Sequence, residues 1–229
     1  MKMIAHRGAS LICRENTLES LVTAAEMGAD AVECDVQMTR DGTYILFHDP
    51  TLERIAKDPR AVSETTLEEM TEILEKNAGY RPPTLRTLAE GYREKAPVLL
   101  DIAVKADAKF LAALESLPFP FIVGVSRMED VALYRKLVPP ERLLGFLPEP
   151  GLAMSFRKDG CGIIRLWENW LGDITPADIK RMAPGTEVWI MSNRNGNMDG
   201  SAGSIARLKE LGADGVLLND VTLLPFVKG

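Results

Sequence analysis

Two histidines near the start of the chain fall where a catalytic role is plausible. His6 follows an apolar run and precedes Arg7, and His48 ends a second strand-like run and precedes Asp49. Imidazole can both give and take a proton near neutral pH, so a pair of histidines can supply an acid and a base. Arginine is well suited to hold a phosphate group. Most lone histidines are structural or surface residues, and that alternative stays open for both.

Glu33 and Asp35 lie in the largely apolar segment Ala31–Val36 and are two residues apart. On a strand, residues two apart point to the same face. Buried carboxylates need a partner, and a divalent cation is an economical one. Oxygen ligands favour Mg²⁺ or Ca²⁺ over zinc. In the alternative, both carboxylates point outward and pair with lysine or arginine.

The chain has only two histidines, so both are candidates for one site. A cation, two proton-transferring groups and an arginine together suit hydrolysis at phosphorus.

Short apolar runs that alternate with amphipathic stretches must position these side chains. The expected strands are Lys2–Ala5, Ala31–Val36, Val98–Val104, Phe121–Val125, Arg142–Leu147, Gly162–Trp167, Glu187–Met191 and Gly215–Leu218, with a shorter run at Tyr44–His48. Apolar residues at helical spacing predict a helix from Thr17 to Met27, with Asn16 as its N-cap and Gly28 at its end. Residues 193–197 are expected to form a Gly/Asn loop after the seventh strand.

The alternation predicts an α/β protein, specifically a (β/α)₈ or TIM barrel formed by residues 1–229 as one domain. Gly28-Ala29-Asp30 and Gly212-Ala213-Asp214 each end a helix and lead into a strand, as expected for repeated β/α units. An open doubly wound sheet would show the same alternation. The polar, turn-rich segment from about 49 to 86, with a helix over Thr66–Lys76, is predicted to be an insertion after the second strand.

The composition excludes several classes of protein. The 229 residues carry a formal net charge of −6, which disfavours bulk electrostatic binding of nucleic acid or of a membrane surface. Cys34 and Cys161 read as small buried hydrophobic residues, and no disulfide framework is implied. The apolar start of the chain is too short for a signal peptide, and no membrane-spanning run follows it. A soluble, cytoplasmic protein is therefore expected.

Several ordered motifs resemble the signature of the glycerophosphodiester phosphodiesterase family. They are His6-Arg7-Gly8, Glu15-Asn16-Thr17, Gly28-Ala29-Asp30, Glu33-Cys34-Asp35-Val36, Thr39-Arg40-Asp41-Gly42 and His48-Asp49 with Leu52 and Arg54. Weaker matches follow at Pro83-Thr84-Leu85, Ser126, Trp189, Gly212–Val216 and Asn219-Asp220. The resemblance is densest over residues 3–54 and extends over most of the chain.

The resemblance implies a barrel enzyme that uses Mg²⁺ or Ca²⁺ to cleave glycerophosphodiesters into sn-glycerol 3-phosphate and an alcohol. By motif, His6 and His48 would be the acid–base pair, Glu33 and Asp35 metal ligands, and Arg7 a phosphate-binding residue. The attacking group could be the glycerol 2-hydroxyl of the substrate, which would give a cyclic phosphate, or water.

The third strand departs from the family pattern, which usually has a metal-binding Glu and a phosphate-binding Lys two residues apart. In this chain Asp101 stands at the Glu position and Ala103 at the Lys position, with Lys105 two residues further on the same face. We expect Asp101 to be the third metal ligand and Lys105 to reach the phosphate. In an alternative register, Ala103 takes the Glu position and Lys105 the Lys position, which removes a metal ligand. In another alternative, Lys105 is merely solvated at the end of the strand.

Two other functions stay open at this point. The altered third strand is compatible with a barrel that binds a phosphorylated ligand but turns it over weakly or not at all. A phosphodiesterase acting on another diester, such as a phosphosugar or a lysophospholipid, is the second. Trp167 and Trp189 are expected to fill the core, with an aromatic wall for the substrate as the alternative. The leaving alcohol and the oligomeric state are left undetermined by the sequence.

Overall fold

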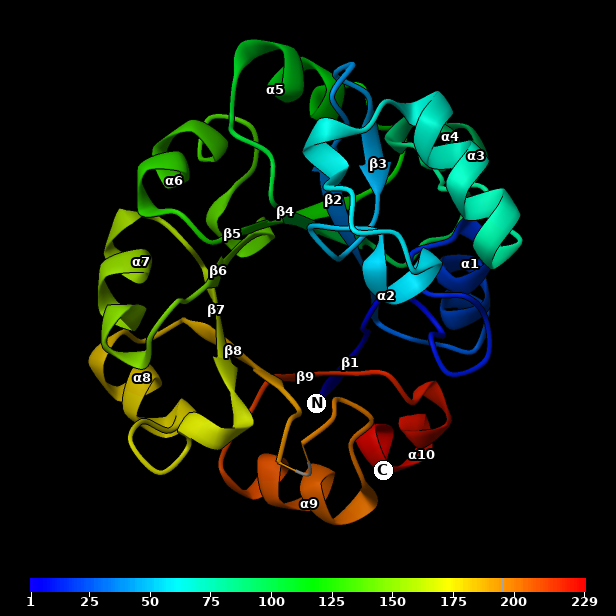
Figure 1. The fold of residues 1–229 in the computed structure, drawn as a ribbon. Coiled ribbons are helices and arrows are strands. Elements are labelled where there is room, and N and C mark those ends of the chain that lie inside the picture. The colour runs from blue at the N-terminus through cyan, green and yellow to red at the C-terminus, as the bar shows by residue number, and fades with distance from the viewer. Residues whose placement is uncertain (195) are drawn as a thin grey trace.

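The structure is a computed structural model that describes residues 1–194 and 196–229. Asn195, in the loop expected over residues 193–197, lies outside the described residues. The parallel strands follow one another around a ring in the order β1-β9-β8-β7-β6-β5-β4-β2, and β2 pairs again with β1 (Figure 1). They are β1 (Lys2–Ala5), β2 (Ala31–Met38), β4 (Val98–Ile102), β5 (Phe121–Val125), β6 (Leu143–Phe146), β7 (Ile163–Trp167), β8 (Glu187–Met191) and β9 (Gly215–Leu218).

The closure of this ring confirms the predicted (β/α)₈ barrel and excludes the open doubly wound sheet. Every predicted strand is present, with ends that differ from the expected ones by two residues at most. A short additional strand, β3 (Tyr44–Leu46), runs antiparallel to the end of β2.

Helices surround the barrel on its outside (Figure 1). They are α1 (Leu18–Glu26), α4 (Leu85–Gly91), α5 (Ala108–Glu115), α6 (Met128–Tyr134), α7 (Ala153–Asp159), α8 (Pro176–Met182), α9 (Ala202–Glu210) and α10 (Leu224–Lys228). Short 3₁₀ turns lie at η2 (Pro140–Arg142), η3 (Pro150–Leu152), η4 (Glu168–Trp170) and η5 (Val221–Leu223).

The insertion after the second strand lies between β3 and α4. It contains α2 (Glu53–Ala56), a 3₁₀ turn η1 (Val62–Glu64) and α3 (Leu67–Ala78), which corresponds to the helix predicted over Thr66–Lys76. Thr66 and Glu69 form a capping box at the start of α3. Apolar side chains of the insertion and of β3 form a small core of their own, which includes Leu52, Met70 and Leu74.

The start of α1 differs from the prediction. Thr17, not Asn16, is the N-cap, and its side chain accepts a hydrogen bond from the backbone N–H of Ser20. Asn16 has a left-handed backbone (φ 56°), and its side chain bonds Asp35 of β2 instead. The expectation that Asn16 caps the helix was therefore wrong, because that side chain is engaged by the neighbouring strand.

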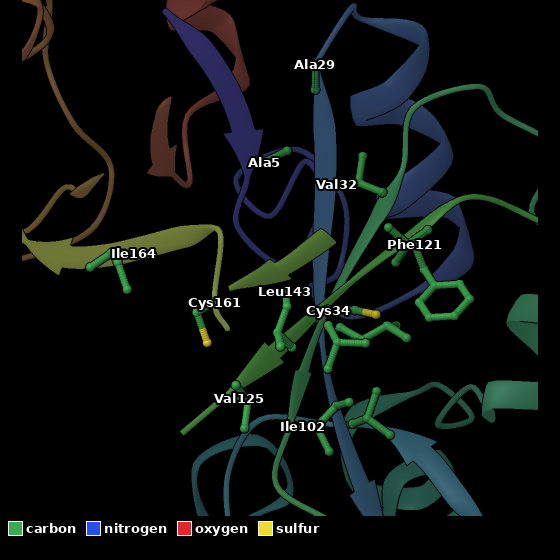
Figure 2. Packing of buried hydrophobic residues seen from close by; sticks show 14 of the residues in the cluster. Ala5, Ala29, Val32, Cys34, Ile102, Phe121, Val125, Leu143, Cys161 and Ile164 are labelled. Atoms are coloured by element: carbon green, nitrogen blue, oxygen red, sulfur yellow. The ribbon is translucent and has the colours of Figure 1, made fainter. Parts of the chain in front are cut away.

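The barrel is packed from both sides. Inward side chains, including Ile4, Leu99, Leu144 and Trp189, fill its interior in one cluster. A larger cluster lies between the outer faces of the strands and the helices, and Figure 2 shows part of it around Cys34, Leu143 and Cys161. Cys34 and Cys161 are buried, as predicted. Among the described residues, no helix is long and apolar enough to cross a membrane.

We expect Gly8→Ala to destabilise the fold more than Gly212→Ala. Both glycines have φ +79°, so alanine meets the same backbone strain, roughly 1–2 kcal/mol, at each position. A Cβ at Gly8 would lie 2.6 Å from the backbone carbonyl carbon of Ser20, whereas one at Gly212 has no neighbour within 4 Å. Urea unfolding of both variants measures the difference, and equal losses of stability would contradict this account.

Candidate active site

Most of the sequence-predicted residues, Lys105 excepted, lie at the end of the barrel formed by the carboxyl ends of its strands, which we call the barrel mouth. Glu33 and Asp35 project from β2 and Asp101 from β4, where Asp35 and Asp101 are direct partners in the parallel pairing. One ligand atom from each of the three lies within 4.8 Å of the others. We refer to Glu33, Asp35 and Asp101 as the carboxylate cluster. Barrel enzymes place their chemistry at this end of the fold.

The cluster is electrostatically unfavourable by itself. Burial raises the pKa of Glu33 well above its ordinary value, and the charges of Asp35 and then Asp101 raise it further. Burial also raises the pKa of Asp101 to about 7, with the charge of Asp35 as the next cause and the charge of Arg165 opposing it. Three close carboxylate oxygens are hard ligands of the kind that Mg²⁺ and Ca²⁺ take, so these residues fit a divalent cation.

His6 follows β1 and is almost fully buried beside the cluster. Its Nδ1 lies 2.8 Å from Asn219 Oδ1, and its Nε2 lies 3.9 Å from Glu33 Oε2. Because an amide oxygen only accepts, Nδ1 carries the proton and Nε2 is free to accept one. Burial, followed by the charge of Arg7, lowers the pKa of His6 to about 4. The imidazole is therefore neutral at neutral pH.

Arg7 connects the loop after β1 to the cluster. Its backbone is left-handed (φ 57°), and its N–H donates to Glu33 at 2.7 Å. Its guanidinium donates to Glu15 at 3.1 Å, and its Nε lies 3.3 Å from Asp35 Oδ2. A strained backbone at a non-glycine residue costs free energy and is found most often at functional sites.

His48 lies just beyond β3 and is more exposed than His6. Its Nδ1 is 2.7 Å from Asp49 Oδ1, which leaves Nε2 free. Arg54 donates to Asp49 and also to Glu15, so a chain of alternating charges runs from His48 to Arg7. Gln37 Nε2 lies 2.8 Å from the backbone carbonyl oxygens of residues 47, 48 and 49.

The third strand of the barrel is β4, and alternate residues along it and just beyond it differ in what they contact. Asp101 joins the cluster, whereas Ala103 offers only a methyl group, which is exposed. Lys105 lies beyond the end of β4 and is exposed. Within residues 1–194 and 196–229, no hydrogen bond or ion pair joins it to the cluster.

Sequence reasoning missed several residues that organise the site. Asn16 donates to Asp35 Oδ2 at 2.7 Å and accepts from the Asp35 backbone N–H. Asn219 bonds His6 and in turn donates to Asp199 at 2.9 Å. Both lay within the resembling motifs, but only the fold shows what they contact. Trp189 is buried in the hydrophobic cluster inside the barrel. Trp167 is partly buried and packs against that hydrophobic cluster.

Comparisons with known proteins agree with this geometry. The family model described as "Glycerophosphoryl diester phosphodiesterase family" matches residues 6–118. A glycerophosphodiester phosphodiesterase of Caldanaerobacter subterraneus is 28% identical over 246 residues, covering 99% of this chain and 97% of that protein. The crystal structure of a Thermotoga maritima glycerophosphodiester phosphodiesterase superposes with a TM-score of 0.80 at 19% identity, covering 97% of this chain and 96% of the other.

An Oleispira antarctica phosphodiesterase, solved in complex with the product sn-glycerol-3-phosphate, superposes with a TM-score of 0.63 at 17% identity. The superposition covers 97% of that protein and 100% of this chain.

The fold and the site define a (β/α)₈ barrel with an acidic cluster, suited to a divalent cation, at the carboxyl ends of its strands. The family match begins at His6 and includes both histidines and the whole carboxylate cluster. The chain belongs to the glycerophosphoryl diester phosphodiesterase family.

We expect Asp101→Asn to stabilise the metal-free protein, and more so at pH 8 than at pH 5. The pKa of Asp101 is about 7 in the folded chain and near 4 in an unfolded one. As pH rises between these values, the unfolded chain releases a proton that the folded chain retains, so this carboxyl lowers stability progressively up to about pH 7. Thermal melts in EDTA measure the effect, with the exposed Asp173→Asn as control.

Added Mg²⁺ should raise the melting temperature of the wild type more than that of Asp101→Asn. If the melting temperature of Asp101→Asn in EDTA at pH 8 is no higher than that of the wild type, the carboxylates do not destabilise the fold as argued.

Proposed function

We propose that the protein hydrolyses glycerophosphodiesters to sn-glycerol 3-phosphate and an alcohol, using a divalent cation and two histidines. The observation that carries the proposal is the convergence of the carboxylate cluster with His6 and Arg7 at one barrel mouth. His48 is linked to Arg7 there through the side chains of Asp49, Arg54 and Glu15. The similarity to a phosphodiesterase solved with sn-glycerol-3-phosphate supports the substrate class.

The carboxylate cluster (Glu33, Asp35, Asp101) would hold the cation, Mg²⁺ or Ca²⁺. When bound there, the cation would neutralise negative charge on the phosphate oxygens and favour attack at phosphorus. Arg7 lies beside the cluster, where its guanidinium can contact the same phosphate once the substrate competes with Glu15 and Asp35.

His6 acts as the base in this scheme. It is neutral, and its Nε2 is free while Asn219 holds Nδ1. It takes the proton from the attacking oxygen, either the glycerol 2-hydroxyl or a water molecule. His48 then gives a proton from Nε2 to the departing alcohol oxygen as the bond from that oxygen to phosphorus breaks. If the 2-hydroxyl attacks, water opens the cyclic phosphate with the two histidines in exchanged roles.

Asp49 and Asn219 are positioning residues for the two imidazoles. Each accepts the Nδ1 proton of one histidine and thereby fixes which nitrogen faces the reaction. Arg54 orients Asp49 in turn.

Turnover should depend on both histidines and on the cation. With glycerophosphocholine or glycerophosphoethanolamine and Mg²⁺ or Ca²⁺, release of glycerol 3-phosphate is followed with its dehydrogenase. His6→Ala and His48→Ala should each lose about 10²-fold or more in kcat, because each removes a proton-transfer group. EDTA should abolish turnover, and added Mg²⁺ or Ca²⁺ should restore it.

Lys158→Ala, on the outer helix α7, serves as the control variant and should retain the wild-type rate. Wild-type turnover that survives both histidine substitutions would overturn the mechanism. A wild type that binds glycerol 3-phosphate but hydrolyses neither diester would favour the ligand-binding alternative or another diester substrate.

A further inference from the structure

Arg165 stands in the middle of β7 and points into the barrel. Ile163 and Trp167, two residues before and after it on the same strand, both pack in the interior cluster. Side chains alternate along a strand, so Arg165 shares their inward face. The residue is only 6% exposed.

This guanidinium lacks the partners that a buried charge requires. Nε and Nη1 are buried and have no hydrogen-bond partner within residues 1–194 and 196–229. Three aromatic rings surround the group instead, with centroids at 4.4 Å for Trp167, 5.0 Å for Phe146 and 6.0 Å for Trp170. Burial lowers the pKa of Arg165 to about 10, so it still carries its charge at neutral pH.

Burying an unpaired cation is costly, and cation–π contacts return only part of that cost. The aromatic rings surround the side chain, while Nε and Nη1 have no hydrogen-bond partner in the described part of the chain. A charged guanidinium with N–H groups that lack partners can bind an anion that enters the barrel.

Arg165 faces the carboxylate cluster across the barrel. In the ring of strands, β7 and β2 are separated by the same number of strands in either direction and so lie on opposite sides (Figure 1). The charge of Asp101 acts on Arg165, and that of Arg165 on Asp101. A phosphate held at the cluster would therefore lie between two sources of positive charge, the cation on one side and Arg165 on the other.

Two positions between them carry small residues, Gly124 on β5 and Ala103 after β4. Gly124 on β5 pairs with Asp101, and a Cβ there would lie 2.2 Å from the Phe146 ring. Phe146 thus packs against Gly124 and contacts the Arg165 guanidinium with its ring. Ala103 leaves the adjoining position on β4 without a charged side chain.

Arg7 differs from Arg165 in this respect. Its guanidinium forms ion pairs with Glu15 and Asp35, although its Nε has no hydrogen bond among the described residues, whereas no ion pair there involves Arg165, whose Nε and Nη1 both lack a hydrogen-bond partner. A guanidinium presents paired N–H groups that match two phosphate oxygens.

We propose that Arg165 binds the phosphate oxygens of the substrate, from the side of the barrel opposite the carboxylate cluster. This inference rests on the proposed function for the identity of the substrate, but anion binding itself is measured without turnover. Arg165 thereby replaces Lys105 as the second phosphate-binding cation of the site.

The test is a titration of the Mg²⁺-loaded protein with inorganic phosphate and with sn-glycerol 3-phosphate, by calorimetry. Arg165→Met keeps a long side chain among the aromatic rings but removes the charge. It should weaken binding of both anions about tenfold or more, as expected for lost charge-assisted hydrogen bonds. Arg165→Lys should retain part of the affinity.

Ala103→Lys, combined with Arg165→Met, should restore binding in part, because position 103 shares the face of Asp101. Arg157→Met, on α7 and bonded to Thr186, is the matched control and should bind as the wild type does. The thermal stability of Arg165→Met should equal or exceed that of the wild type, since an unpaired buried charge is removed. A purely structural arginine would instead lower the melting temperature without a selective loss of anion affinity.

Unchanged phosphate affinity in Arg165→Met would overturn the proposal. A loss of phosphate affinity in Lys105→Ala, with none in Arg165→Met, would overturn it as well.

The proposed reaction and the proposed role of Arg165 can fail separately. A protein that turns over no diester but loses phosphate affinity in Arg165→Met retains the anion site and refutes only the proposed reaction. Normal turnover with unchanged kcat/KM in Arg165→Met refutes only the role of Arg165.

Discussion

Three carboxylates held within 4.8 Å of one another, away from water, repel each other, and the rest of the barrel mouth is organised around that repulsion. Neighbouring groups offset it only in part. The backbone N–H of Arg7 and the side chain of Asn16 each donate to one carboxylate, and both residues adopt left-handed backbones to do so. The carboxylate cluster and these backbone conformations therefore destabilise the fold, and the cluster becomes favourable only when a positive charge binds to it.

The two imidazoles of the site occupy different environments, although their hydrogen bonds are alike. His6 is enclosed next to the cluster and bonded to a neutral amide, whereas His48 stands nearer to solvent and is bonded to a carboxylate. In the proposed mechanism the two rings have opposite proton-transfer roles, and this difference in surroundings is what would distinguish them.

Sequence patterns were sufficient for the strands and the barrel because apolar runs and glycine-ended helices repeat along the chain. The clustering of Glu33 with Asp35 also followed from alternation on one strand. Contacts between distant segments could not be predicted in this way. Asn16 looked like a helix cap because capping spacing is local, while its actual partner, Asp35, is brought to it by the closure of the barrel. Arg165 similarly became notable only when its lack of partners was visible.

Gln37 has an implication for how the site tolerates change. Its amide nitrogen, on β2, lies 2.8 Å from three successive carbonyl oxygens, between which it shares its two N–H groups, at the point where the chain leaves β3 for the insertion. The histidine at this point is therefore held from two sides, because Gln37 of the barrel binds its backbone and Arg54 of α2 binds its partner Asp49. The segment from α2 to α3 shares its small core with Ile45 and Phe47, directly before this histidine, so a change in the length of the segment would also affect the imidazole. The insertion and the barrel therefore constrain one another at this histidine, and a substitution in either would be transmitted to it.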